Sequence, residues 1–157
     1  VRDVIQRTVD PNLLAITAGR IPPNPSELLA SERMRTLLTN LAHGPFDWIV
    51  IDTPPAVTQT IAHVVQRADM VVVPTRPSPH DLRAVGATVD LCERAGKPVV
   101  FVINGATPHA RITSEAAIAL SQHGTVAPTT IHQRTDFAAS RKLFSQAAVI
   151  TRQNAAS

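Results

Sequence analysis

Four short apolar runs in this sequence are each followed by polar residues whose types can take part in chemistry. We call these polar segments, which directly follow the apolar runs, the polar exits: Asp52–Pro55, Pro74–Arg76, Asn104–Gly105 and His132–Arg134. Asp52 is the most informative residue, because a carboxylate at the tip of a strand can hold a magnesium-bound water beside a phosphate. The alternative is that Asp52 caps a helix at a strand-to-helix turn, as in many α/β proteins. The two prolines after it stiffen the loop and favour the binding role.

The elements that must position these residues are short strands. Residues 13–18, 46–51, 70–73 and 99–103 are short apolar runs, and the last two are nearly continuous in β-branched residues. Such runs suit strands that are buried on both faces of a parallel sheet. A weaker strand is predicted over residues 126–131.

Helical segments lie between these runs. Asn24 is placed to cap a helix that opens at Pro25, and Ser78 is placed to cap another that Gly96 ends. The alternation of strands and helices predicts an α/β fold with a mainly parallel, doubly wound sheet. Ligands of such sheets bind beyond the C-terminal ends of the strands. The predicted helices cover residues 25–41, 79–95, 114–122 and 136–144.

The composition is that of one soluble domain. The chain has 157 residues, of which 44% are hydrophobic and 17% are charged. No apolar run approaches the ~20 residues that cross a bilayer, so we expect no membrane span. Cys92 is the single cysteine, and the first residues do not form a signal segment. A cytoplasmic protein is therefore the expectation.

Several linked stretches between Phe46 and Ser140 occur in an order that identifies a family. They are IVIDTPP, RADMVVVPTRPSPHDLRAVGATVDL, KPVVFVINGA and TVAPTTIHQRTDFAAS. Together they resemble the ParA/MinD class of deviant P-loop ATPases, and most closely the ParA proteins of plasmid and chromosome partition. The resemblance implies a P-loop NTPase fold, with ATP and magnesium as ligands and a homodimer as the assembled form.

The same resemblance implies roles for individual residues. Asp52 matches the Walker B acid that contacts magnesium through water, with Thr53 and Pro54 beside the nucleotide. Asn104 matches the asparagine that hydrogen-bonds adenine in this family. Its side-chain amide offers both a donor and an acceptor, which an adenine edge requires. A turn residue before Gly105 is the alternative for Asn104. The loop that flanks the base is matched by Ile131, His132 and Gln133.

The first third of the chain resembles a different branch of the same superfamily. The stretches NLLAITAG, IPPNPSELL and SERMR are similar to the CpsD-like tyrosine kinases of capsule and exopolysaccharide export. In that family IPPNPSELL lies between the phosphate loop and the Walker B strand. Both relatives imply the same fold and the same role for Asp52.

Both families use a glycine-rich loop of the form KGGxGKT, whose amides hold the phosphates. The 157 residues contain no such loop, and Gly96–Lys97 is followed by Pro98. We therefore expect a single ParA-like nucleotide-binding domain over residues 1–157 that is incomplete at its N-terminus. It would lack the first strand and the phosphate loop, and residues 146–157 would form a disordered tail.

The basic residues of the chain are unevenly distributed. They exceed the acidic ones by fifteen to twelve, and the excess lies after Ala110, because residues 1–110 carry ten of each. A nonspecific DNA-binding surface like that of ParA proteins is the hypothesis, and a solvated surface is the alternative. The residues assigned to it are Arg134, Arg141, Lys142 and Arg152.

The function predicted from these observations is a partition-class ParA-like ATPase domain that is inactive alone. One alternative is a relative of the capsular tyrosine kinases, although the chain contains no tyrosine that could be phosphorylated. A second alternative is a non-catalytic remnant that dimerises or binds DNA. Nucleotide binding with and without magnesium discriminates among the three.

Overall fold

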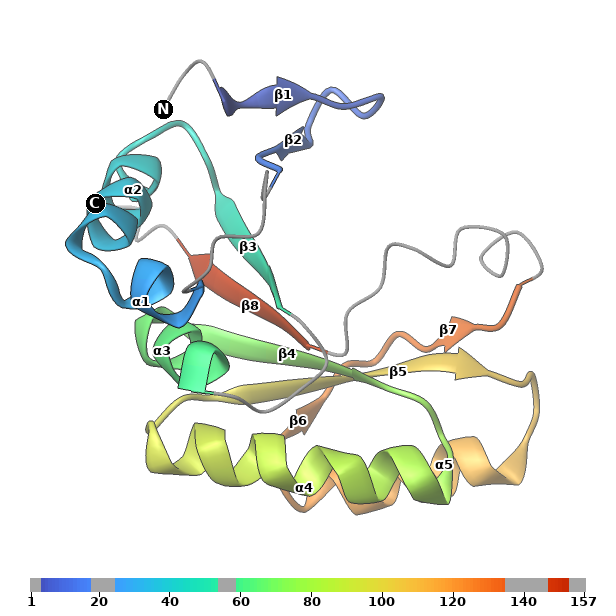
Figure 1. The fold of residues 1–157 in the computed structure, drawn as a ribbon. Coiled ribbons are helices and arrows are strands. Elements are labelled where there is room, and N and C mark those ends of the chain that lie inside the picture. Colours follow the sequence, from blue (N-terminus) through green and yellow to red (C-terminus); the bar gives the residue numbers. More distant parts are fainter. Residues whose placement is uncertain (1–3, 18–24, 54–58, 135–146, 153–157) are drawn as a thin grey trace, which may run out of the picture.

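A six-stranded sheet forms the centre of the molecule (Figure 1). The structure is a computed structural model, and it describes residues 4–17, 25–53, 59–134 and 147–152. The strand order is β3-β8-β4-β5-β6, and β7 pairs with the far end of β5. The strands are β1 (Gln6–Arg7), β2 (Leu14–Ala15), β3 (Trp48–Thr53), β4 (Met70–Thr75), β5 (Val99–Ala106), β6 (Thr125–Val126), β7 (Ile131–His132) and β8 (Ala147–Arg152).

Three of the helices pack against one face of the sheet. Alternate residues of the central strands are buried there, among them Val71 and Val73 on β4 and Phe101 and Ile103 on β5. They form one apolar cluster with residues of α3, α4 and α5, the last two lying below the sheet in Figure 1. The helices are α1 (Pro25–Ala30), α2 (Glu32–Ala42), α3 (Gln59–Arg67), α4 (Pro79–Arg94) and α5 (Arg111–Ser121).

The second face of the sheet is more open. Trp48 and Val50 of β3 are 53% and 59% exposed, and Val72 and Val102 of the central strands are half-buried. None of α3, α4 and α5 covers this face, because their partners in the core are the residues of the first face. A doubly wound sheet has helices on both faces; α3, α4 and α5 cover only the first face, so coverage of the second face stays a prediction.

Strand β8 has a position that the sequence did not indicate. It lies between β3 and β4 and is antiparallel to both, with Val149 opposite Ile51 on one side and Val71 on the other. Strands β4, β5, β6 and β7 pair in parallel, as predicted. The segment expected to be a disordered tail thus contributes a strand, and this strand connects β3 to the rest of the sheet.

The strands extend further than their apolar runs. Asp52 and Thr53 are the last residues of β3, Thr75 ends β4, and Asn104 lies inside β5. The first residues of the predicted polar exits are therefore still part of the sheet. The reason is that neighbouring strands supply backbone partners there: β8 pairs along all of β3, and β7 pairs with the end of β5.

Other elements also differ from the sequence-based expectation. Residues 25–41 are two helices, because Ser31 is extended and its side chain accepts a hydrogen bond from the Met34 amide as the N-cap of α2. The run 13–18 contributes only β2, which pairs antiparallel with β1 outside the main sheet. The single strand predicted over residues 126–131 is replaced by two short strands, β6 and β7, at the two ends of this run. The helix predicted over 136–144 lies outside the described residues.

Candidate functional site

The first part of the candidate site is the C-terminal end of β3. Asp52 is exposed, and Thr53, the next residue, is 3% exposed and belongs to the helix-covered face. Asp52 has Ala148 of β8 as its register partner. Pro54 lies outside the described residues. The carboxylate is thus accessible at the sheet edge where the Walker B role would place it.

The second part is formed by β5 and β7. Asn104 is half-buried and stands in register with Ile131, and His132 is in register with Ala106. The pairing continues beyond the strand, because the Gln133 amide donates to the Ala106 carbonyl over 3.0 Å. The structure thus brings together the residues that the resemblance assigned to the base. Their contact with a base remains a prediction.

The two parts are separated along the sheet. Strands β8 and β4 lie between β3 and β5, and the register places Asp52 level with Ala148, Val72 and Val100, four residues before Asn104. Asp52 and Asn104 are therefore about 14 Å apart across the strands and about 13 Å apart along them, or roughly 19 Å in all. In a nucleotide the base and the terminal phosphate are at opposite ends. Any single ligand that contacted both residues would have to be extended, with its base at Asn104 and its phosphates directed toward Asp52.

Arg76 lies between these two parts, and sequence reasoning gave it no role. It follows β4 directly, and its side chain is exposed. The side chain runs beside Gly105, a residue with a φ of +65° that favours glycine. The signal that could have identified Arg76 was its position in the exit Pro74–Arg76, next to the strand that carries Asn104.

The donor set fits a magnesium nucleotide. Magnesium takes one or two carboxylates and completes its coordination with phosphate and water, and Asp52 offers such a carboxylate. Asn104 offers the amide that an adenine edge requires. Within the described part of the chain, no three His, Cys, Asp or Glu residues are placed to hold a metal ion by themselves.

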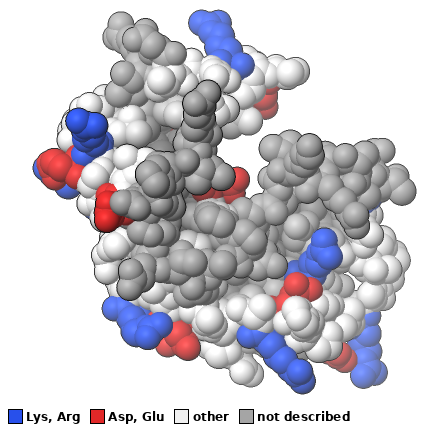
Figure 2. Space-filling view, in the orientation of Figure 1, with Lys and Arg blue, Asp and Glu red and all other residues white. Residues whose placement is uncertain are grey.

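The residues assigned to DNA are not brought together by the described structure. Arg134 follows β7, and Arg152 is the last residue of β8, in register with Trp48. Arg141 and Lys142 lie outside the described residues. Figure 2 shows the described basic side chains of this face standing apart, several of them beside acidic ones. DNA binding remains a prediction without further support.

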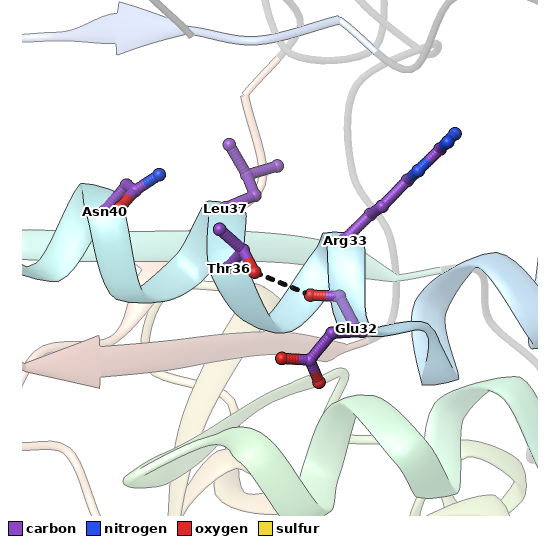
Figure 3. A pocket seen from close by; sticks show the side chains of 5 residues that line it. All are labelled: Glu32, Arg33, Thr36, Leu37 and Asn40. Atoms are coloured by element: carbon purple, nitrogen blue, oxygen red, sulfur yellow. Dashed lines mark hydrogen bonds between the residues drawn. The ribbon is translucent and has the colours of Figure 1, made fainter.

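A shallow hollow of about 260 Å³ lies on the surface of α2 (Figure 3). All five residues that line it belong to this one helix, and Thr36 uses its hydroxyl to donate to the Glu32 carbonyl over 2.9 Å. Arg33 points away from the other residues. Nothing from β3, β5 or β7 contributes to the hollow, so it is separate from the candidate site. The lining residues are Glu32, Arg33, Thr36, Leu37 and Asn40.

The helices give no indication of a membrane segment. Among the residues that the structure describes, no helix combines the length and the apolar character needed to cross a bilayer. The longest helix, α4, has 16 residues and carries several charges.

The chain is similar to bacterial tyrosine-protein kinases. It is 34% identical over 103 residues to tyrosine-protein kinase Ptk of Acinetobacter johnsonii, a match that covers 64% of this chain. It is 37% identical over 93 residues, 59% of this chain, to tyrosine-protein kinase Wzc of Salmonella typhimurium. It is also 49% identical over 65 residues, 41% of this chain, to CapB of Staphylococcus aureus.

These relatives belong to the ParA/MinD-like P-loop superfamily. The matches span only 14% of Ptk, 13% of Wzc and 28% of CapB, so the chain corresponds to a small part of each relative. No family model matches the chain. No solved structure matches it significantly. The α/β fold with parallel strands β4, β5 and β6 is consistent with a P-loop NTPase.

Proposed function

We propose that this chain is part of the ATP-binding domain of a tyrosine-protein kinase of the capsule and exopolysaccharide type. The observation that carries the proposal is the 34% identity to Ptk over 64% of the chain. It is supported by the resemblance of NLLAITAG and IPPNPSELL to the CpsD-like kinases. The alternative named from the sequence therefore replaces partition as the preferred function, because the relatives above are kinases and none supports partition.

In this proposal the chain's own residues bind and orient the nucleotide. Asn104 hydrogen-bonds the adenine edge beside Ile131, and the Asp52 carboxylate orients a water of the magnesium ion near the phosphates. Bound magnesium would neutralise phosphate charge. Because the chain has no tyrosine, the phosphate acceptor of a kinase reaction would lie elsewhere.

We further propose that the 157 residues are one nucleotide-binding domain of the ParA-like type without its phosphate loop. Such a loop supplies much of the charge stabilisation in phosphoryl transfer. We therefore expect that purified chain with magnesium and ATP shows no turnover above a buffer blank. Turnover that disappears in Asp52→Ala would contradict this and reveal a phosphate site among these residues.

Nucleotide binding tests the base-recognition part of the proposal. Adenosine binding, measured by calorimetry, should weaken about tenfold in Asn104→Ala, which removes the two hydrogen bonds to the base. Asn40→Ala is the matched control, because Asn40 is an exposed asparagine on α2. Equal affinities for both variants and the parent would overturn the role of Asn104.

Magnesium dependence tests the role of Asp52. Magnesium should increase the affinity for ATP in the parent chain and have little effect in Asp52→Ala, because the water-mediated contact is lost. Asp90→Ala, at an exposed position of α4, is the matched control and should behave as the parent. A magnesium effect that persists in Asp52→Ala would place the metal elsewhere.

A further inference from the structure

Arg76 and Asn104 stand side by side at the carboxyl end of the sheet. Strands β4 and β5 are parallel, with Thr75 in register with Ile103, so the next pair along is Arg76 and Asn104. The Arg76 side chain runs along the β5 backbone: its Cγ and Nε lie 3.7 Å from the position that a Cβ would take on Gly105. The Arg76 side chain is therefore held beside Gly105, the residue that follows Asn104.

Among the described residues, the Arg76 guanidinium has no acidic partner. In the described part of the chain it makes no ion pair and no hydrogen bond, and the side chain is exposed. A planar guanidinium presents several donors in a fixed geometry that matches phosphate oxygens. A charged group of this kind beside a half-buried amide suits a ligand that has both a polar base and an anionic group.

We propose that Arg76 binds a phosphate group of the nucleotide whose base is recognised by Asn104. The inference rests on the proposed function, because it uses the same base position. It adds a residue that neither the resemblance nor the relatives assign. Because the 157 residues contain no glycine-rich phosphate loop, the positive charge of Arg76 would favour ADP over adenosine at this edge.

The test compares ligands that differ only in their phosphates. Dissociation constants of adenosine and ADP are measured by calorimetry without magnesium for the parent chain, Arg76→Ala and Arg76→Lys. The parent should bind ADP more tightly than adenosine. Arg76→Ala should lose about tenfold in ADP affinity and keep its adenosine affinity, and Arg76→Lys should retain part of the ADP preference.

Arg83→Ala is the matched control, because Arg83 is an exposed arginine on α4 and not on a strand of the sheet. It should bind both ligands as the parent does, and an unchanged melting temperature of Arg76→Ala shows that the fold is retained. The inference is overturned if Arg76→Ala binds ADP as tightly as the parent, or loses adenosine and ADP affinity equally. Absence of adenosine binding to the parent chain would instead overturn the proposed function.

Discussion

The two halves of the molecule differ in how completely they bury their apolar residues. Every residue of the main apolar cluster lies between Ile61 and Leu120. In the first half Leu13, Trp48 and Val50 are 58%, 53% and 59% exposed. The region from α3 to α5 therefore contains a core of its own, whereas residues 4–53 depend on contacts with other parts of the chain.

The difference has a local origin. Strand β5 is buried on alternate positions and lies between β4 and β6, and α4 has a capped start at Ser78. In contrast, among the described strands β3 pairs only with β8, along one edge. Contacts among residues 59–126 therefore stabilise the second half of the molecule. The attachment of β3 depends instead on β8, a strand that is distant in the sequence.

Disrupting the backbone pairing of β8 should destabilise the first half of the molecule more than any other change considered. Ile150 is in register with both Val50 and Met70, and proline at this position removes a backbone donor and disrupts the ladder. We expect Ile150→Pro to lower the free energy of unfolding by at least about 3 kcal/mol. Hydrogen exchange should show faster exchange in β3 and retained protection in β5.

Ile150→Val is the control, because it preserves the strand backbone. If β3 keeps its protection in Ile150→Pro, then β8 is not what connects β3 to the sheet.

A pair of valines tests the difference in burial directly. Val71 is fully buried on β4, and Val50 is 59% exposed on β3. Val71→Ala should lower the free energy of unfolding by about 2 kcal/mol, from lost burial and a residual cavity. Val50→Ala should cost less than about 1 kcal/mol. Urea denaturation of both variants measures the two values, and equal losses would remove the contrast between the halves.

The helix caps offer a smaller test of the same contrast. The Ser78 side chain accepts from the Asp81 amide over 3.1 Å, and Ser31 accepts from Met34 over 3.2 Å. Ser78→Ala should cost about 1 kcal/mol of global stability, because α4 packs on the core. Ser31→Ala should mainly increase fraying of α2, with a global loss below about 0.5 kcal/mol. Urea denaturation measures the loss of unfolding free energy in each variant, and hydrogen exchange measures the fraying of α2. A larger loss of unfolding free energy in Ser31→Ala than in Ser78→Ala would mean that α2 is the helix more strongly coupled to the core.

The ionisation of Cys92 should have the smallest effect on the stability of the fold at neutral pH. Burial raises the pKa of the Cys92 thiol from 9.0 to about 11. Because the folded-state pKa is the higher one, this group contributes its full stability below about pH 9 and loses it as the pH rises toward 11. At pH 8 the folded chain should react slowly with a thiol reagent and the urea-unfolded chain rapidly. Rapid labelling of the folded chain would contradict the burial of this residue.

A Cys92→Ala variant isolates the alkaline effect. Its stability should fall less steeply between pH 9 and 11 than that of the parent, because it has no thiol to ionise. Parallel pH profiles for the two proteins would assign the alkaline loss to other groups.

Several elements of the second half follow from local patterns in the sequence. Strands β4 and β5 and helix α4 were predicted from their β-branched runs and from Ser78, because each signal is local. Helix α3 was missed, although Ile61, Val64, Val65 and Ala68 recur at helical spacing and are all buried. The signal was present in that case and was not used.

Which elements contact one another depends on residues that are far apart in the sequence. The place of β8 between β3 and β4 depends on backbone pairing between residues about 80 to 100 positions apart, which no local pattern encodes. The strand ends at Asp52 and Asn104 were shifted for the same reason, since a strand continues as long as a neighbour pairs with it. The sequence identified Asp52 and Asn104 as candidates from their types and positions after apolar runs. That Arg76 lies beside Asn104 follows from the parallel register of β4 and β5, and only the folded sheet determines that register.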